Sequence, residues 1–265
     1  MTPPPDELVA TLRAAGCVFA EEEARLLREA ATTPADLAER VARRTAGEPL
    51  EQILGWAEFR GLRIPVEPGV FVPRQRTGLL VDLALRLHTT VQVVVDLCCG
   101  SGALGAALAE GLGHPIELHA ADVDPAATRC AARTLAELGA HLHTGDLYEA
   151  LPVRLRGRVD LLLVNSPYVP TAEIAAMPPE ARDHEPRAAL DGGPDGLDLH
   201  RRVAAGAPKW LASAGLLLLE TSEEQAPETA AAVRAAGLEA AIHSDDELGA
   251  TAVSGRAQAG SSSAA

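Results

Sequence analysis

The chain has 265 residues, of which 47% are hydrophobic and 3% aromatic, and its formal net charge is −14. This length allows one large domain with a small appendage, and the hydrophobic fraction is enough to bury a sizeable core. A protein that grips nucleic acid by its phosphates normally carries a basic stripe. Lys and Arg occur here at most in adjacent pairs, so we expect no direct grip on nucleic acid.

The sequence carries no signal for secretion, a membrane or a metal. Its first residues, MTPPPDELVA, lack a basic start and an apolar core, and no apolar run approaches the roughly 20 residues that cross a bilayer. The cysteines, at positions 17, 98, 99 and 130, form no CxxC pair, which favours reduced thiols in a cytoplasmic protein. His141 and His143 would lie on one face of a strand, but no third ligand is nearby in sequence, so we expect no metal site.

The first 75 residues predict two small units. Residues 1–46 favour a short helical domain, with Thr33 and Pro34 as the N-cap and first turn of one helix. Residues 47–75 favour a linker that contains a β-hairpin between Glu58 and Val72. Alternating apolar residues and glycine punctuation in that stretch are typical of a hairpin.

Residues 76–256 predict one α/β domain. After a helix at about 76–87, apolar runs alternate with Ala-rich helical stretches. The runs are continuous, which is typical of parallel strands covered by helices on both faces. We therefore expect a doubly wound, mostly parallel α/β sheet, followed by a disordered tail at 257–265. The expected strands lie at about 91–96, 116–122, 140–144, 158–164 and 215–220.

The first strand ends in the turn VVVDLCCGSGALG, where Gly100 and Gly102 let a ligand approach the main chain at a helix N-terminus. Asp96, the last residue of that strand, would repel a pyrophosphate but suits a cationic ligand. S-adenosyl-L-methionine carries a sulfonium and an ammonium group and no phosphate, so the turn favours this cofactor. The residues of this turn expected at the cofactor are Asp96, Leu97, Cys98, Cys99, Gly100, Ser101 and Gly102. Asn165, at a later strand end, is expected to contact the cofactor as well.

Two later strand ends complete the expected cofactor pocket. Asp122, followed by Val123, ends the second strand twenty residues after Gly102, where a carboxylate can accept from both hydroxyls of a ribose. Asp146 and Leu147 follow the third strand, where the adenine ring is expected. Taken alone, the Gly-Asp pair at Asp146 is also typical of an ordinary turn.

The fourth strand ends at Val164 and continues into NSPYVP. An amide or exocyclic amine has its lone pair delocalised, so a methylating site must accept both N–H bonds to aim that lone pair at the methyl group. The Asn165 side-chain oxygen and the backbone carbonyl of Ser166 can be these acceptors. Pro167 stiffens the loop, and Tyr168 can stack on a planar group. The segment therefore predicts methyl transfer to a flat nitrogen.

Seven segments, in order from about Gly47 to Arg256, resemble the PrmC/HemK family, which methylates glutamine side chains in bacterial peptide-chain release factors. They include VPRQRT at the family's IPRPxTE, DLCCGSGALG at its first motif, NSPYVP at its NPPYIP, and EPRAALDGGPDGL. The resemblance implies a class I methyltransferase fold, S-adenosyl-L-methionine as cofactor, and a glutamine-directed site at Asn165, Ser166, Pro167 and Tyr168.

The resemblance also implies the substrate, a release factor whose target glutamine lies in a Gly-Gly-Gln segment, with Arg74 and Glu185 as further substrate-binding candidates. We expect a monomer with no membrane partner. The chain departs from the family on the substrate side: Ser166 replaces the first proline, Gln75-Arg76 replaces Pro-Glu, and Gly78 replaces a glutamate. The helical region of about 46 residues is also shorter than the family's usual substrate-recognition domain.

Two alternatives stay open. An N6-adenine or other exocyclic-amine methyltransferase acting on nucleic acid uses a similar Asn-Pro-Pro-aromatic loop, although the acidic charge disfavours it. A cofactor-binding module without activity is favoured only by Ser166. Residue type alone also allows Glu185 and Arg187 to form a loop ion pair without a functional role, and Arg74 to be a solvated side chain.

Overall fold

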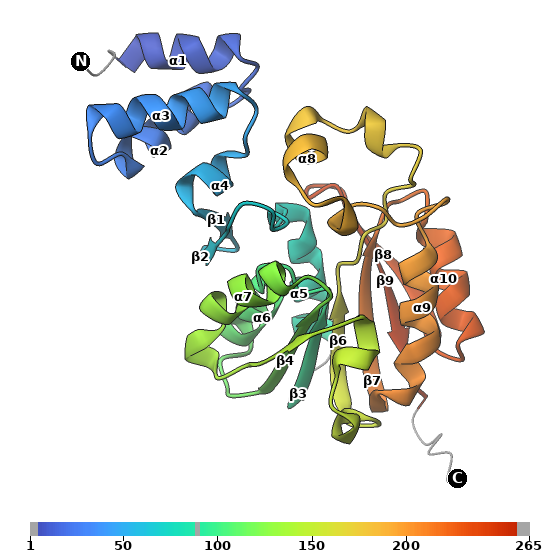
Figure 1. Cartoon of the computed structure of the whole chain (residues 1–265). Helices are drawn as coiled ribbons and strands as arrows, with labels where there is room; N and C mark the ends of the chain where they lie inside the picture. The colour runs from blue at the N-terminus through green and yellow to red at the C-terminus, as the bar shows by residue number, and fades with distance from the viewer. Residues whose placement is uncertain (1–4, 88–90, 259–265) are drawn as a thin grey trace.

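The computed structural model describes residues 5–87 and 91–258, so the tail predicted at 257–265 lies almost wholly outside the described residues. Four helices surround a small apolar core that includes Leu12, Leu27 and Ile53. One of them begins at Thr33 as predicted, because the Thr33 hydroxyl accepts a hydrogen bond from the Asp36 N–H at 3.1 Å. In Figure 1 these helices lie apart from the sheet, with the hairpin between them. They are α1 (Pro5–Ala14), α2 (Ala20–Ala30), α3 (Pro34–Thr45) and α4 (Leu50–Leu54).

The hairpin is shorter than predicted. β1 (Trp56–Phe59) pairs antiparallel with β2 (Leu62–Pro65), and the pairing ends there instead of continuing to Val72. Proline has no N–H to donate to a ladder, and Pro68 follows soon after Pro65. Residues 66–74 therefore leave the hairpin as a loop. The domain boundaries at 46 and 75 stay a prediction.

A seven-stranded sheet forms the main body, in the order β5-β4-β3-β6-β7-β9-β8. The first five strands in this order (β5, β4, β3, β6 and β7) run parallel to one another. β9 is antiparallel to both of its neighbours, β7 and β8. The predicted mostly parallel sheet is confirmed. The strands are β3 (Val93–Leu97), β4 (Glu117–Asp122), β5 (His141–Thr144), β6 (Val159–Val164), β7 (Leu211–Thr221), β8 (Glu239–Asp245) and β9 (Ala250–Arg256).

Helices cover both faces of the sheet, as Figure 1 shows. Val94 of β3 belongs to the apolar core on one face and Val95 to the core on the other, because successive strand residues point to opposite faces. The strand order reverses beside β3, and this reversal is where ligands bind in such sheets. On one face lie α5 (Gly78–Leu87), α6 (Ala103–Leu112) and α7 (Pro125–Thr134), and on the other α9 (Asp198–Gly206) and α10 (Ala226–Ala235).

The sequence did not predict β8, β9 or α10. β8 (EAAIHSD) and β9 (ATAVSGR) contain few of the β-branched residues and none of the Phe, Tyr or Trp that favour strands, so local pattern does not reveal them. Within 5–87 and 91–258, no helix is long and apolar enough to span a bilayer. The remaining short elements are α8 (Pro179–His184) and the 3₁₀ turns at Gln75–Thr77, Ala136–Leu138, Leu147–Ala150, Val153–Leu155, Ile174–Ala176, Arg187–Ala189 and Ala207–Lys209.

His141 and His143 of β5 lie beside a third histidine, His119 of β4, which sequence distance had concealed. The His119 ring stacks on both, with ring centroids 4.7 and 5.2 Å apart. His119 Nδ1 also lies 2.9 Å from His143 Nε2. Among the described residues, no group of three His, Cys, Asp or Glu side chains could hold a metal.

Candidate active site

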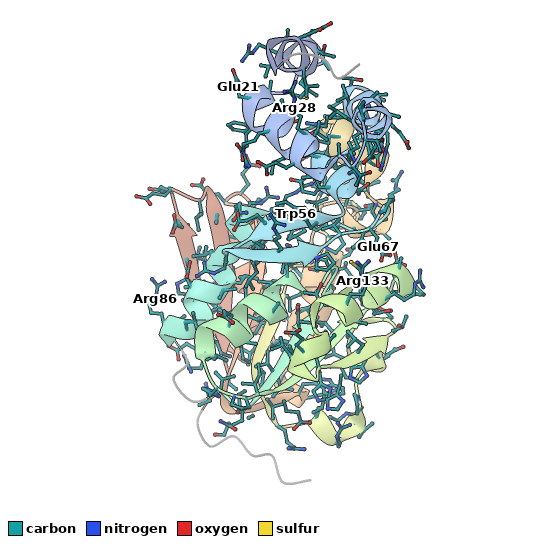
Figure 2. The ribbon with its side chains drawn as sticks, turned by 90° about the vertical axis from the view of Figure 1, so that its left-hand side faces the viewer. Glu21, Arg28, Trp56, Glu67, Arg86 and Arg133 are labelled. Atoms are coloured by element: carbon teal, nitrogen blue, oxygen red, sulfur yellow. The ribbon has the colours of Figure 1, made fainter. Side chains whose placement is uncertain are left out.

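A pocket lies at the carboxyl ends of β3, β4 and β6, under the loop 66–74. The loop is tied to α7 by an ion pair of 2.6 Å between Arg133 and Glu67, and Figure 2 shows both side chains where the hairpin meets the helices. Most of the residues predicted from sequence line this one pocket: Arg74, Cys98, Cys99, Gly100, Ser101, Asp122, Val123, Asp146, Leu147, Asn165, Ser166, Pro167, Tyr168 and Glu185.

The glycine turn after β3 has three residues in the left-handed backbone region. Gly100 has φ 54° and Gly102, the N-cap of α6, has φ 79°, as a tight strand-to-helix turn requires. Cys98 has φ 60° although it is not glycine, which costs roughly 1–2 kcal/mol. Nothing lies within 4 Å of a Cβ built on Gly100, so the main chain there is open to a ligand.

Asp96 lies behind this turn and does not line the pocket, and neither do Leu97 and Gly102. The Asp96 carboxylate is fully buried, and its Oδ2 accepts a hydrogen bond from the Gly105 N–H at 3.0 Å. Its Oδ1 has no hydrogen-bond partner among the described residues. Burial raises the pKa of Asp96 to about 8. The structure thus gives Asp96 contact with the start of α6, whereas direct contact with a ligand stays a prediction.

Asp122 organises the turn and faces the pocket. Its Oδ2 accepts from the Gly100 N–H and its Oδ1 from the Asp124 N–H, both at 2.9 Å. Burial raises the pKa of the Asp122 carboxyl. Val123, beside it, is 58% exposed.

The third strand end carries Asp146 and Leu147. Asp146 forms an exposed ion pair with Arg202 at 2.7 Å, and Leu147 is buried with φ 47°. A residue other than glycine costs free energy in the left-handed region. The conformation of Leu147 is therefore more than an ordinary Gly-Asp turn requires. Both residues line the pocket.

Asn165, Ser166, Pro167 and Tyr168 line the other end of the pocket. The Asn165 Nδ2 group donates to Thr77 Oγ1 at 3.2 Å. Ser166 is 1% exposed, and its hydroxyl has no partner among the described residues. A buried hydroxyl without a partner is costly in the free protein, so a polar ligand group beside it would be favoured.

Tyr168 is held at three points. Its hydroxyl donates to Glu220 Oε1 at 3.1 Å and accepts from Arg76 Nη2 at 3.1 Å, and its backbone carbonyl accepts from Gln225 Nε2 at 2.9 Å. Burial and the charge of Glu220 raise the pKa of Tyr168 to about 12. The phenol therefore stays protonated at neutral pH, and its ring position is fixed.

Glu185 and Arg74, which are far apart in sequence, form an ion pair. Arg74 Nη2 donates to Glu185 Oε1 at 2.7 Å, and the Val72 N–H donates to the same oxygen at 3.2 Å. Oε2 is buried and has no partner in the described part of the chain. Burial raises the pKa of the Glu185 carboxyl. The loop ion pair with Arg187 that residue type allowed is wrong, since Arg187 pairs with Asp191.

Sequence reasoning missed the residues beneath Asn165 and Tyr168. Thr77 contacts the first, while Arg76 and Glu220 contact the second. The available signal was the glutamate in the otherwise apolar run LLLLET of β7, because a glutamate is seldom buried unless it is paired. Arg76 had been noted only as a departure from the resembled family.

The pocket has two chemically distinct ends. Carboxylates from Asp122, Asp124 and Asp146 surround one end, and no Lys or Arg of the pocket lining belongs to the turn there. A phosphate would be repelled at this end, whereas a cationic or hydroxyl-rich ligand would not. The other end offers the oxygens of Asn165 and Ser166 to a hydrogen-bond donor.

Residues 62–178 match the family model described as the methyltransferase small domain. The chain is 43% identical over 188 residues to the release factor glutamine methyltransferase of Geobacter sulfurreducens, covering 70% of this chain and 65% of that relative. It is 38% identical to the enzyme of the same name from Moorella thermoacetica, covering 74% and 70%. The aligned chain thus spans just under two thirds of the Geobacter relative's length.

A third relative is named for a different substrate. The chain is 37% identical to a 4-amino-L-phenylalanine/4-methylamino-L-phenylalanine methyltransferase of Streptomyces pristinaespiralis, covering 74% of this chain and 69% of that relative. Among solved structures, a methyltransferase from Pyrococcus furiosus superposes with a TM-score of 0.57 at 15% identity, covering 83% of this chain and 99% of that one. The class I methyltransferase fold expected from the resemblance is confirmed.

Proposed function

The chain belongs to the family of release factor glutamine methyltransferases, and we propose that it transfers a methyl group from S-adenosyl-L-methionine to the side-chain amide nitrogen of a glutamine in a peptide-chain release factor. One observation carries the proposal: the NSPY segment and the acidic turn after β3 line the same pocket. We place the target glutamine in a Gly-Gly-Gln segment, as the resemblance implies.

The pocket of this chain fits S-adenosyl-L-methionine. Each oxygen of Asp122 makes one hydrogen bond to a backbone N–H and keeps a lone pair for a ribose hydroxyl. The open main chain at Gly100 leaves room for the amino-acid part of the cofactor. Leu147 and Val123 offer apolar surface to the adenine ring, and Asp146 offers an acceptor.

S-adenosyl-L-methionine supplies an electrophilic methyl group when it is bound. The residues of this chain would prepare the nucleophile: the Asn165 oxygen and the Ser166 carbonyl accept the two N–H bonds of the glutamine amide. This fixes the plane of the amide and turns its lone pair toward the methyl group. The same oxygens stabilise the positive charge on nitrogen until one proton is released to solvent.

The helical N-terminal part is proposed to contribute to recognition of the protein substrate. Arg44 of α3 lies 3.5 Å from Glu180 of α8, so these helices contact the segment that leads to Glu185. Arg44 is also paired with Glu23 of α2 at 2.6 Å. A protein bound against α1–α4 would therefore lie next to the substrate end of the pocket.

A second candidate substrate is a free aromatic amine. The relative named for 4-amino-L-phenylalanine favours this candidate, because an arylamine nitrogen is also flat and conjugated. The oxygens of Asn165 and Ser166 would suit either nucleophile. An exocyclic amine of nucleic acid is disfavoured by the net charge of −14.

Transfer of a labelled methyl group separates these candidates. The purified protein is incubated with labelled S-adenosyl-L-methionine and, in parallel, a release factor, 4-amino-L-phenylalanine or RNA. We expect label in the release factor, lost when its Gly-Gly-Gln glutamine is changed to alanine. Label in the small amine or RNA instead would overturn the proposed substrate, and label in none of them would favour a cofactor-binding module without activity.

A further inference from the structure

Tyr168 lines the substrate end of the pocket, and residues outside the pocket lining hold it there. Its hydroxyl donates to Oε1 of Glu220 at 3.1 Å, and Glu220 is 3% exposed and absent from the lining. The ring of His200, which is also absent from the lining, packs against the Tyr168 ring with centroids 6.2 Å apart and a tilt of 51°. Protein groups therefore hold the hydroxyl and part of the ring, and the rest of the ring is left for the pocket.

Arg76, in the 3₁₀ turn Gln75–Thr77, contacts the same hydroxyl. Its Nη2 donates to the Tyr168 oxygen at 3.1 Å, and its Nε lies 3.4 Å from Oε1 of Glu220. The Arg76 side chain is 43% exposed and lines the pocket. Glu220 and Arg76 thus form an ion pair in which each partner also contacts the Tyr168 hydroxyl.

The chemistry of these three groups fixes the direction of their hydrogen bonds. A guanidinium only donates, so the Tyr168 oxygen accepts from Arg76. An ionised carboxylate only accepts, so the single hydroxyl proton points to Glu220. The hydroxyl therefore has no proton to give to a substrate, and with a pKa of about 12 it is not a base at neutral pH. The ring remains as the functional part of the side chain.

The charge of Arg76 keeps this arrangement in place. Glu220 follows four leucines in β7, and a buried carboxylate costs several kcal/mol unless it is paired and hydrogen-bonded. Burial raises the pKa of the Glu220 carboxyl, and the positive charge of Arg76 opposes that rise. A protonated Glu220 could donate to Tyr168 and turn the hydroxyl away. Arg76 favours the ionised form, which only accepts.

We propose that Glu220 and Arg76 are positioning residues that hold Tyr168 through its hydroxyl, so that its ring is already in place when a planar acceptor amide binds. A flat ring beside the amide restricts the rotation of the amide out of the plane in which its lone pair meets the methyl group. Because the ring is fixed beforehand, no entropy is lost in ordering it on binding. This inference rests on the proposed function, in which the nucleophile is a planar amide.

The test separates the hydroxyl, its acceptor and its donor. Tyr168→Phe keeps the ring and removes the hydroxyl. Glu220→Leu removes the acceptor and continues the apolar run of β7, whereas the conservative Glu220→Gln keeps an acceptor without the charge. Arg76→Met removes the donor and the positive charge.

Two matched controls lie outside the pocket lining. Tyr148→Phe removes the other tyrosine hydroxyl of the chain, which donates to the Val203 carbonyl at 2.7 Å. Asp82→Asn neutralises a carboxylate that is paired with Arg60 at 2.6 Å. We expect both controls to keep the wild-type rate of methyl transfer.

The first readout does not depend on activity. A tyrosine gives a Raman doublet whose intensity ratio reports whether its hydroxyl donates, accepts or does both. In a Tyr148→Phe background Tyr168 is the single tyrosine, and we expect the ratio of a hydroxyl that does both. Glu220→Leu should shift the ratio toward acceptance only, and Glu220→Gln should not. In Arg76→Met the ratio should move the opposite way once the pH is high enough to ionise Glu220. An unchanged ratio in Glu220→Leu and Arg76→Met would overturn the inference.

The second readout is single-turnover methyl transfer to the release factor. Tyr168→Phe, Glu220→Leu and Arg76→Met should each be about tenfold slower, the scale of one hydrogen bond to a charged group, with cofactor Kd within about twofold. Glu220→Gln should recover most of the rate. Because Tyr168→Phe and Glu220→Leu break the same link, the double variant should be at most about twofold slower than either single variant.

Independent losses that multiply to about 100-fold in the double variant would contradict positioning through the hydroxyl. Wild-type rates in Tyr168→Phe and Glu220→Leu, or equal losses in the two controls, would also contradict it. If the wild-type protein itself transfers no methyl group, the proposed function fails, and the Raman comparison alone decides whether Glu220 and Arg76 hold Tyr168.

Discussion

Asp122 is expected to contribute to cofactor binding in two separable ways. Its oxygens face the pocket, and they also accept from the N–H groups of Gly100 and Asp124. Asp122→Asn keeps one oxygen, so it should lose one hydrogen bond to a charged group, about 1.5 kcal/mol or roughly tenfold in Kd. Asp122→Ala loses both oxygens and also releases the glycine turn, so we expect about 3 kcal/mol, or roughly 100-fold.

The assay is titration calorimetry with S-adenosyl-L-methionine, using Asp160→Asn as the control because Asp160 lies outside the pocket lining. Burial raises the pKa of Asp122, and the ionised form is the one that accepts both ribose hydroxyls. Wild-type affinity should therefore fall as the pH drops through that raised pKa, and Asp122→Asn should not show this fall. Wild-type affinity in both variants, or binding of NAD in place of S-adenosyl-L-methionine, would refute the cofactor assignment.

Three further predictions concern the turn after β3 and the NSPY segment. Asp96 has a pKa of about 8 in the folded protein, so it keeps a proton that the unfolded chain releases above about pH 4. The free energy of unfolding of the wild type should therefore fall between about pH 4 and 8. Calorimetry should then show the melting temperature of Asp96→Asn gaining on the wild type as pH rises, and parallel pH profiles would contradict this. Burial raises the pKa of both Cys98 and Cys99, which keeps the thiols protonated and unreactive. Alanine at both positions should therefore leave the rate of methyl transfer within about threefold of the wild type. Loss of turnover with intact folding and cofactor binding would show that the thiols take part in the reaction. Ser166→Pro should keep single-turnover activity within a few-fold, because only the backbone carbonyl is assigned a function and the serine hydroxyl has no described partner; a 100-fold loss would show that the hydroxyl takes part.

The sequence predicted the parallel strands and most of the pocket because those features have local signals. Apolar runs mark β3, β4, β6 and β7, and Gly100, Asp122 and the NSPY segment follow directly at strand ends. In an open α/β sheet, residues at neighbouring strand ends come together whatever their distance in sequence. Three short sequence segments were therefore enough to predict most of the pocket lining.

What the sequence did not predict depends on pairing between distant segments. Glu220 reaches Tyr168 only because β7 lies next to β6, and Thr77 reaches Asn165 only because η1 (Gln75–Thr77) lies beneath the same strand end. No local pattern specifies either contact. Asp96 was expected at the ligand from its place at the strand end, but its side chain is turned toward Gly105 and away from the pocket lining.

The central claim is that the Asn165 oxygen orients an amide nitrogen for methylation. The most direct measurement is single-turnover transfer to a release factor, or to a peptide containing its Gly-Gly-Gln segment, by wild type, Asn165→Ala and Asn165→Asp. We expect Asn165→Ala to transfer methyl about 100-fold more slowly or worse with cofactor affinity nearly unchanged, the scale for losing one preorganised polar group. Asn165→Asp keeps an acceptor but loses the donor to Thr77, so its rate should fall between the two. Wild-type transfer by Asn165→Ala would contradict the account.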